Sequence, residues 1–106
     1  LLAALGFAHF AMRDYAAAAE ASEAALAEAA GSATPLILGA IAWVGAGQID
    51  RAIINFARLN AIAPKLVEAR LAGCWLTSNA DYLARAHMFF RISAGLAPPE
   101  AADALR

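Results

Sequence analysis

Two histidines and one cysteine are the residues of this 106-residue chain best suited to metal binding or nucleophilic chemistry. A structural or catalytic zinc site needs three or four His, Cys or carboxylate ligands that converge on one point. Neither His9 nor His87 has a partner at ligand spacing, so we predict no metal site and two packed helical histidines. Cys74 has no neighbouring base or cation, and we expect it to be a small buried apolar side chain.

Motifs for catalysis and for cofactor binding are absent from the sequence. There is no serine elbow, no phosphate-binding glycine loop and no paired-acid motif. Gly45-Ala46-Gly47 indicates a turn and not half of a nucleotide-binding fingerprint. We therefore expect a chain with no catalytic residue, no cofactor and no enzymatic activity of its own.

The composition favours closely packed helices. Hydrophobic residues make up 62% of the chain, and roughly a third of all residues are alanine, which forms helices well but buries little area. The net charge of −1 provides no basic face for nucleic acid. A single cysteine excludes an internal disulfide, and the opening residues lack the basic region of a signal peptide. We expect a cytoplasmic location.

Residues 29–49 contain no charged side chain, which raises the possibility of a membrane segment. Glycine and proline residues interrupt this stretch, and its solid apolar part, residues 36–44, is roughly half of the ~20 residues that a bilayer requires. We predict a buried helix here. A membrane-embedded hairpin around residues 33–49 is the alternative, and it would make the protein insoluble without detergent.

A shift of 34 positions aligns the first part of the chain with the second. Small and apolar residues then coincide along both segments. The aligned pairs are Leu2 with Leu36, Gly6 with Ala40, His9 with Trp43, Ala18 with Ala52, Ser22 with Phe56, Ala25 with Leu59, and Ala30 with Pro64. Such a period is typical of stacked helical hairpins.

The repeat resembles the tetratricopeptide family, through Leu5-Gly6, Trp43, Ala18, Ala52, Phe56 and Pro64. The resemblance implies an all-α, right-handed superhelix with hairpins at residues 1–30 and 34–64. Ala18 and Ala52 would lie where helices cross closely, Phe56 would fill the gap to the next repeat, and Pro64 would close the second hairpin. Ser22 and Ala30 depart from the family pattern, which usually has an aromatic residue and a proline there.

Turn and capping signals agree with these hairpins. Asp14 and Asp50 are each positioned to cap the helix that follows. Thr34 is the expected N-cap of the next helix, with Pro35 at its first position.

The register ends after Pro64, so we assign residues 65–106 to a C-terminal cap. Residues 65–77 indicate one short helix. Ser78 and Asp81 have capping-box spacing before a helix over residues 80–94, and Gly95 would end that helix. Its expected apolar stripe is Leu83, His87, Phe90 and Ala94, with Tyr82, Ala86 and Phe89 beside it.

Residues 67–100 also resemble the C-terminal end of a bacterial multidomain group. In that group, tetratricopeptide repeats follow an adenylate/guanylate cyclase domain or a winged-helix domain. The chain opens inside a helical pattern without an initiating Met, so we expect a piece of a longer protein. The alternative function is therefore the regulatory region of a nucleotide cyclase, and the sequence upstream of Leu1 would decide it.

The family's concave face implies the candidate partner-binding groove. Its main positions here are Phe7, Phe10, Thr34, Ile37, Ile41 and Val44, with Ala3 and Ala11 beside them. All but Thr34 are apolar and none is a cation, so a carboxylate clamp is not expected. We expect instead a scaffold for an apolar or helical protein segment. The alternative is a groove filled by the chain's own cap, by missing repeats or by a second copy.

Two further expectations follow. Replacing Phe7 or Ile41 with Asp should abolish association and leave the fold intact. The charges also divide along the chain, with acids at Asp14, Glu20, Glu23 and Glu28 and bases at Arg51, Arg58, Lys65, Arg70, Arg85 and Arg91. Such a division is typical of a solvated surface, and self-association is the alternative.

Overall fold

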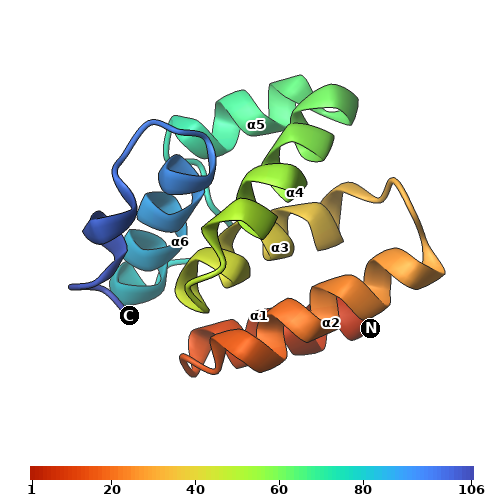
Figure 1. Cartoon of the computed structure of the whole chain (residues 1–106), viewed down its shortest axis with the longest axis horizontal. Coiled ribbons are helices and arrows are strands. Elements are labelled where there is room, and N and C mark those ends of the chain that lie inside the picture. Colours follow the sequence, from red (N-terminus) through yellow and green to blue (C-terminus); the bar gives the residue numbers. More distant parts are fainter.

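The computed structural model describes all residues, 1–106, and contains helices without strands, which confirms the all-α prediction. Figure 1 shows the arrangement of the helices. The elements are α1 (Leu2–Ala11), α2 (Tyr15–Glu28), α3 (Ala33–Gly45), α4 (Ile49–Ile62), α5 (Pro64–Leu71), α6 (Ala80–Ser93) and the 3₁₀ turn η1 (Pro99–Ala102).

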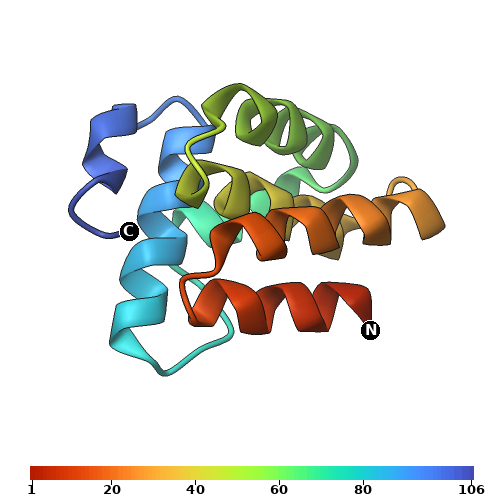
Figure 2. The ribbon, with the colours of Figure 1, turned by 60° about the horizontal axis from the view of Figure 1, so that its bottom comes forward.

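The first four helices form two hairpins that pack side by side. Helices α1 and α2 pack against each other across a short turn, and α3 and α4 do the same. Helix α2 also packs on α3, so the two hairpins share an interface. Figure 2 shows α1 and α2 running in opposite directions along the same edge of the molecule.

Helix α3 is the central element of the fold. Every residue from Pro35 to Gly45 is buried, because α2, α4 and α6 all pack around this helix. This explains why the segment carries no charge. None of the helices has both the length and the apolar character required to cross a membrane.

Small residues let the helices approach closely, as the repeat predicted. Ala18 and Ala52 are fully buried. A Cβ atom at Gly6 would lie only 2.3 Å from Leu38 Cδ2, and one at Gly39 would lie 2.5 Å from Asn55 Nδ2. A side chain at either position would force its neighbour to shift, so the two glycines favour the close packing of α1 on α3 and of α3 on α4.

The helix caps confirm some of the predicted signals. Asp14 caps α2, since its Oδ1 accepts a hydrogen bond from the Ala17 amide at 3.4 Å. Gly95 follows α6 with φ +77°, the left-handed conformation expected after a helix end. Pro64 begins α5 directly after the second hairpin.

Other predicted boundaries are wrong by one or two residues. Asp50 lies inside the first turn of α4, and Gln48 is the N-cap. Helix α3 begins at Ala33, one residue before the predicted cap Thr34, with Ser32 as N-cap. Both helices begin before the predicted cap residue, and neither Ser32 nor Gln48 forms a side-chain capping hydrogen bond.

The cap region corrects two further predictions. The short helix ends at Leu71 and not at residue 77, because Gly73 adopts φ +94° and turns the chain. The N-cap of α6 is Asn79 and not Ser78: Asn79 Oδ1 accepts a hydrogen bond from the Tyr82 amide at 2.9 Å. Phe56 packs on the cap helix α6 in place of a further repeat, with its ring centroid 5.3 Å from that of Phe90.

Helix α6 covers the ends of the hairpins and completes one core (Figure 2). The predicted stripe is largely wrong: only Phe90 of its four residues is buried, while Leu83, His87 and Ala94 are partly exposed. The buried residues are Arg85, Ala86, Phe89, Phe90, Ile92 and Ser93. Arg85 Nη1 donates to the Phe10 carbonyl at 2.8 Å, and Nη2 donates to the Ala11 carbonyl at 3.1 Å. The arginine therefore caps the C-terminal end of α1.

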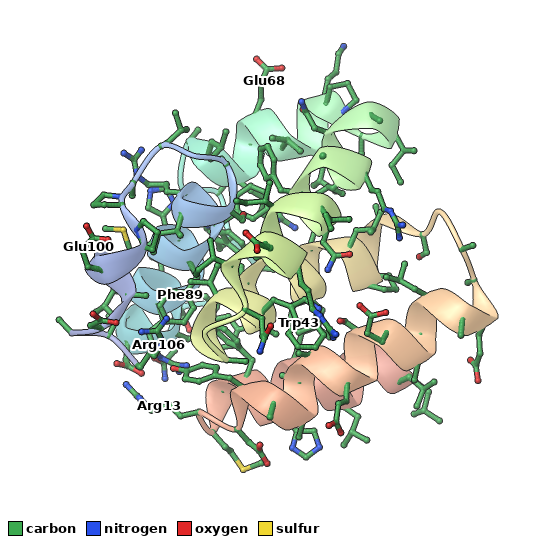
Figure 3. All side chains as sticks on the ribbon, in the orientation of Figure 1. Arg13, Trp43, Glu68, Phe89, Glu100 and Arg106 are labelled. Atoms are coloured by element: carbon green, nitrogen blue, oxygen red, sulfur yellow. The ribbon has the colours of Figure 1, made fainter.

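Arg106 caps the C-terminal end of α3 in the same manner. Its Nη2 donates to the Val44 carbonyl at 2.9 Å and its Nε donates to the Gly45 carbonyl at 3.0 Å. Val44 and Gly45 stand 34 positions after Phe10 and Ala11, the two acceptors on α1. The 34-residue spacing thus relates equivalent backbone atoms of the two hairpins. Figure 3 shows Arg106 at the α6 end of the molecule.

Candidate partner-binding groove

Three of the six predicted groove residues are not available to a partner. Phe10, Ile41 and Val44 are fully buried within the core. Helix α6 packs on α3, and the Phe89 ring centroid lies 5.9 Å from that of Phe10. The chain's own cap therefore fills this part of the face.

The other three predicted residues, Phe7, Thr34 and Ile37, lie together at the open end of the face. They line a cavity of about 390 Å³, which we call the Leu76 groove. Its far wall comes from α5, from the loop after α5 and from the start of α6. The lining consists of Phe7, Thr34, Ile37, Arg70, Trp75, Leu76, Thr77 and Tyr82.

The loop wall of the groove is held by hydrogen bonds. Trp75 Nε1 donates to the Arg70 carbonyl at 3.1 Å, and Arg70 Nη1 donates to the Cys74 carbonyl at 2.8 Å. The Trp75 ring also packs edge-on to Phe90, with centroids 5.5 Å apart. These contacts hold the loop on the N-terminal side of Leu76, a residue that is 94% exposed.

Arg70 is the groove residue that sequence reasoning missed. None of the predicted groove positions is a cation, but α5 brings Arg70 to the lining although it belongs to neither hairpin. Its guanidinium carbon lies 5.3 Å from the Trp75 ring centroid, and no carboxylate of the chain forms an ion pair with it. The sequence carried no signal for it, since Arg70 reaches the lining only through the packing of α5.

Hydroxyl groups complete the polar part of the lining. Thr77 Oγ1 accepts a hydrogen bond from the Asn79 amide at 3.1 Å, which ties the loop to the cap of α6. Burial raises the pKa of Tyr82 above 10.0, and the nearby Arg85 charge acts in the opposite direction. Tyr82 therefore stays neutral at physiological pH. The groove thus presents apolar surface, neutral hydroxyls and one positive charge.

The remaining candidates for chemistry do not come together. His9 Nδ1 lies 3.7 Å from Asp14 Oδ2, while His87 Nδ1 is buried without a hydrogen-bond partner on α6. Cys74 is exposed in the loop after Gly73, so the prediction of a buried cysteine is wrong. No group of three or more His, Cys, Asp or Glu residues is placed to hold a metal ion.

Comparison of the chain with protein-family models, with curated proteins and with solved structures gives no match.

Proposed function

We propose that this chain is a non-catalytic interaction module that holds an apolar segment of a protein partner in the Leu76 groove. The observation that carries the proposal is the 94% exposure of Leu76 at the groove, directly after a loop that is held by hydrogen bonds. An apolar side chain that is exposed to this extent gains free energy when it is buried against another apolar surface. Phe7, Ile37 and Trp75 supply that surface beside it.

The proposed partner segment carries an acidic side chain next to its apolar residues. Arg70 is the only charged residue of the lining, and it has no carboxylate partner within the chain. An acidic residue of the partner would face a cation already positioned by its bond to Cys74 and by the Trp75 ring. A basic segment would be repelled.

The arrangement of the hairpins is proposed to be a tetratricopeptide-type superhelix. Two observations support it: the paired hairpins, and the arginine caps on carbonyls that stand 34 positions apart. In this reading α6 covers most of the concave face, and the Leu76 groove is the part left for a partner.

Selection from a phage-displayed random peptide library tests the proposed function. We expect enrichment of peptides that combine apolar residues with Asp or Glu. Leu76→Asp should weaken binding of a selected peptide at least about tenfold, since it places a charge in the apolar contact. The matched control is Leu96→Asp, because Leu96 is 54% exposed and lies outside the groove.

Two outcomes would reject the proposal. The first is a library that yields no enriched sequence. The second is a selected peptide that binds the Leu76→Asp and Leu96→Asp variants equally well, since its site would then lie elsewhere. Circular dichroism of both variants confirms that the helices are retained.

A further inference from the structure

The outer faces of α2 and α4 carry exposed stripes that match each other in size and charge. The α2 stripe consists of an acidic residue between two small residues. The α4 stripe consists of a basic residue between two large apolar residues. The α2 residues are Ala16, Glu20 and Ala24, and the α4 residues are Ile54, Arg58 and Ile62. Each stripe has a spacing of four residues, which places its members on one face of the helix.

Nothing in the chain covers the α4 stripe. Ile54 is 53% exposed and Ile62 is 50% exposed. Neither Glu20 nor Arg58 takes part in an ion pair, because the ion pairs of the chain all involve other residues. Two apolar side chains and a free cation are thus presented together on one helix.

Two hollows lie beside the α4 stripe, between α4 and residues of α2. Arg58 lines both of them, with volumes of about 420 and 290 Å³. The larger is walled by Leu26 and Ile62, and the smaller by Glu23 and Ile54. Neither shares a residue with the Leu76 groove. Figure 1 shows α2 and α4 as separate rods that diverge from each other.

We infer that this face binds a second copy of the chain, with α2 of each copy packed on α4 of the other. Glu20 would then pair with Arg58 of the partner subunit. Ala16 and Ala24 would face Ile54 and Ile62 of the partner subunit, where their small size admits the larger side chains. Both stripes are the same when followed in either direction, so the match holds for parallel and for antiparallel helices.

Two-fold symmetry makes a second copy the favoured occupant. In a symmetric dimer each contact occurs twice, so one chain that carries both stripes forms two complementary contacts with its copy. Neighbouring charges follow the same division: Glu23 and Glu28 lie on α2 and Arg51 lies on α4. Asp50, in the first turn of α4, is the one acid on that helix. The Trp43 ring holds Arg51 in place, since the Arg51 guanidinium carbon lies 4.6 Å from the centroid of that ring.

Charge reversal tests the inference, with sedimentation velocity over a range of protein concentrations as the measurement. We expect a concentration-dependent dimer for the unmodified chain. Arg58→Glu should raise the dimer Kd at least about tenfold, since Glu20 then meets a like charge at both contacts. Glu20→Arg should do the same. The double variant E20R/R58E should restore the dimer.

A mixing experiment separates pairing from a general effect of charge. Each single variant alone should be monomeric, whereas an equal mixture should form heterodimers, because one contact is native and the other is a reversed pair. Lys65→Glu and Glu100→Arg are the matched controls, since both residues are exposed and lie outside α2 and α4. They should leave the Kd unchanged.

Several results would overturn the inference. They are a monomer at every concentration, a dimer unaffected by Arg58→Glu, and a failure of both the double variant and the mixture to restore association. All of the exchanged residues are exposed, so the variants should retain helical circular dichroism spectra.

Discussion

Arg85 shows how a single charge can be accommodated inside this core. Its side chain is 1% exposed, yet its donors reach the Phe10 and Ala11 carbonyls, the Tyr15 hydroxyl and Asp81. Its guanidinium carbon also lies 5.0 Å from the Phe10 ring centroid. Arginine suits this position because its planar group makes several directed hydrogen bonds and also stacks on aromatic rings.

Replacing Arg85 with Met should destabilise the protein by about 2–4 kcal/mol. The apolar volume is largely kept, but the carbonyls at the end of α1 lose a charged donor inside the core. Urea unfolding followed by circular dichroism measures the change. Lys65→Met is the control and should change stability by less than about 0.5 kcal/mol, because Lys65 is exposed. Equal stability of the two variants would contradict the capping role.

Asp81 makes the stability of the folded protein depend on pH in the acid range. The Arg13 hydrogen bond lowers the pKa of Asp81 below 3.8; partial desolvation opposes this, and Arg85 adds to the lowering. An aspartate with a lowered folded-state pKa stabilises the protein fully above the unfolded value. That contribution is lost as the pH falls through the folded-state pKa.

Asp81→Asn should therefore lower Tm at neutral pH. The difference in Tm from the unmodified chain should shrink as the pH falls below 3.8, and vanish once the Asp81 carboxyl is protonated in both states. Thermal unfolding at a series of pH values measures it. Glu68→Gln is the control, since Glu68 points away from the molecule (Figure 3) and forms no ion pair. A difference in Tm between Asp81→Asn and the unmodified chain that stays constant with pH would contradict the stabilising role of the Asp81 carboxylate.

At the scale of the helices, α1 and α3 are held at their ends by arginines and along their lengths by small residues. Arg85 and Arg106 occupy the C-terminal ends. Gly6 permits close contact of α1 with Leu38 of α3 and with the backbone of α2 at Ala18. The position and angle of the first hairpin therefore depend on the lack of a side chain at Gly6.

Gly6→Ala should destabilise the protein by about 1–3 kcal/mol, although alanine forms helices better than glycine. The new Cβ would lie 2.3 Å from Leu38 Cδ2 and 3.3 Å from the Ala18 carbonyl oxygen. Urea unfolding measures the change, with Ala8→Gly on the exposed face of α1 as the control for propensity alone. A stabilised Gly6→Ala variant would show that α1 can move away from α3.

Sequence periodicity predicted the elements well and their ends poorly. The 34-residue shift located Ala18, Ala52 and the hairpin turns, because close packing demands small residues at fixed positions. Helix starts were missed where a capping residue stands beside another of equal quality, as with Ser78 and Asn79. Local sequence cannot decide which of two adjacent caps is used, since that choice depends on how α6 packs.

At the scale of the whole molecule, three of the six predicted groove residues line a cavity and three lie in the core. Phe7, Thr34 and Ile37 line it, whereas Phe10, Ile41 and Val44 belong to the core. The difference arises because α6 packs across the ends of the hairpins, which no pattern within residues 1–64 reveals. Arg70 and Leu76 were missed for the same reason, since they join the groove from the cap region.

The sequence suggested that Phe7→Asp and Ile41→Asp would both abolish association and keep the fold, and the structure changes this expectation. Ile41→Asp should unfold the protein and not merely block association, because Ile41 is fully buried and an aspartate there would be a buried unpaired charge. We expect loss of more than about 4 kcal/mol. Phe7→Asp should be milder, since Phe7 is only partly buried. Thermal unfolding of both variants distinguishes these outcomes, and a folded Ile41→Asp protein would contradict the core described here.

The most direct test of the interaction module is an NMR titration of the labelled protein with a peptide selected from the library. The two indole N–H signals report on different places: Trp75 lines the Leu76 groove, while Trp43 is buried in α3. We predict that the Trp75 signal shifts with peptide concentration, that the Trp43 signal does not, and that Leu76→Asp abolishes the shift. A peptide that binds without moving the Trp75 signal would contradict the proposed site.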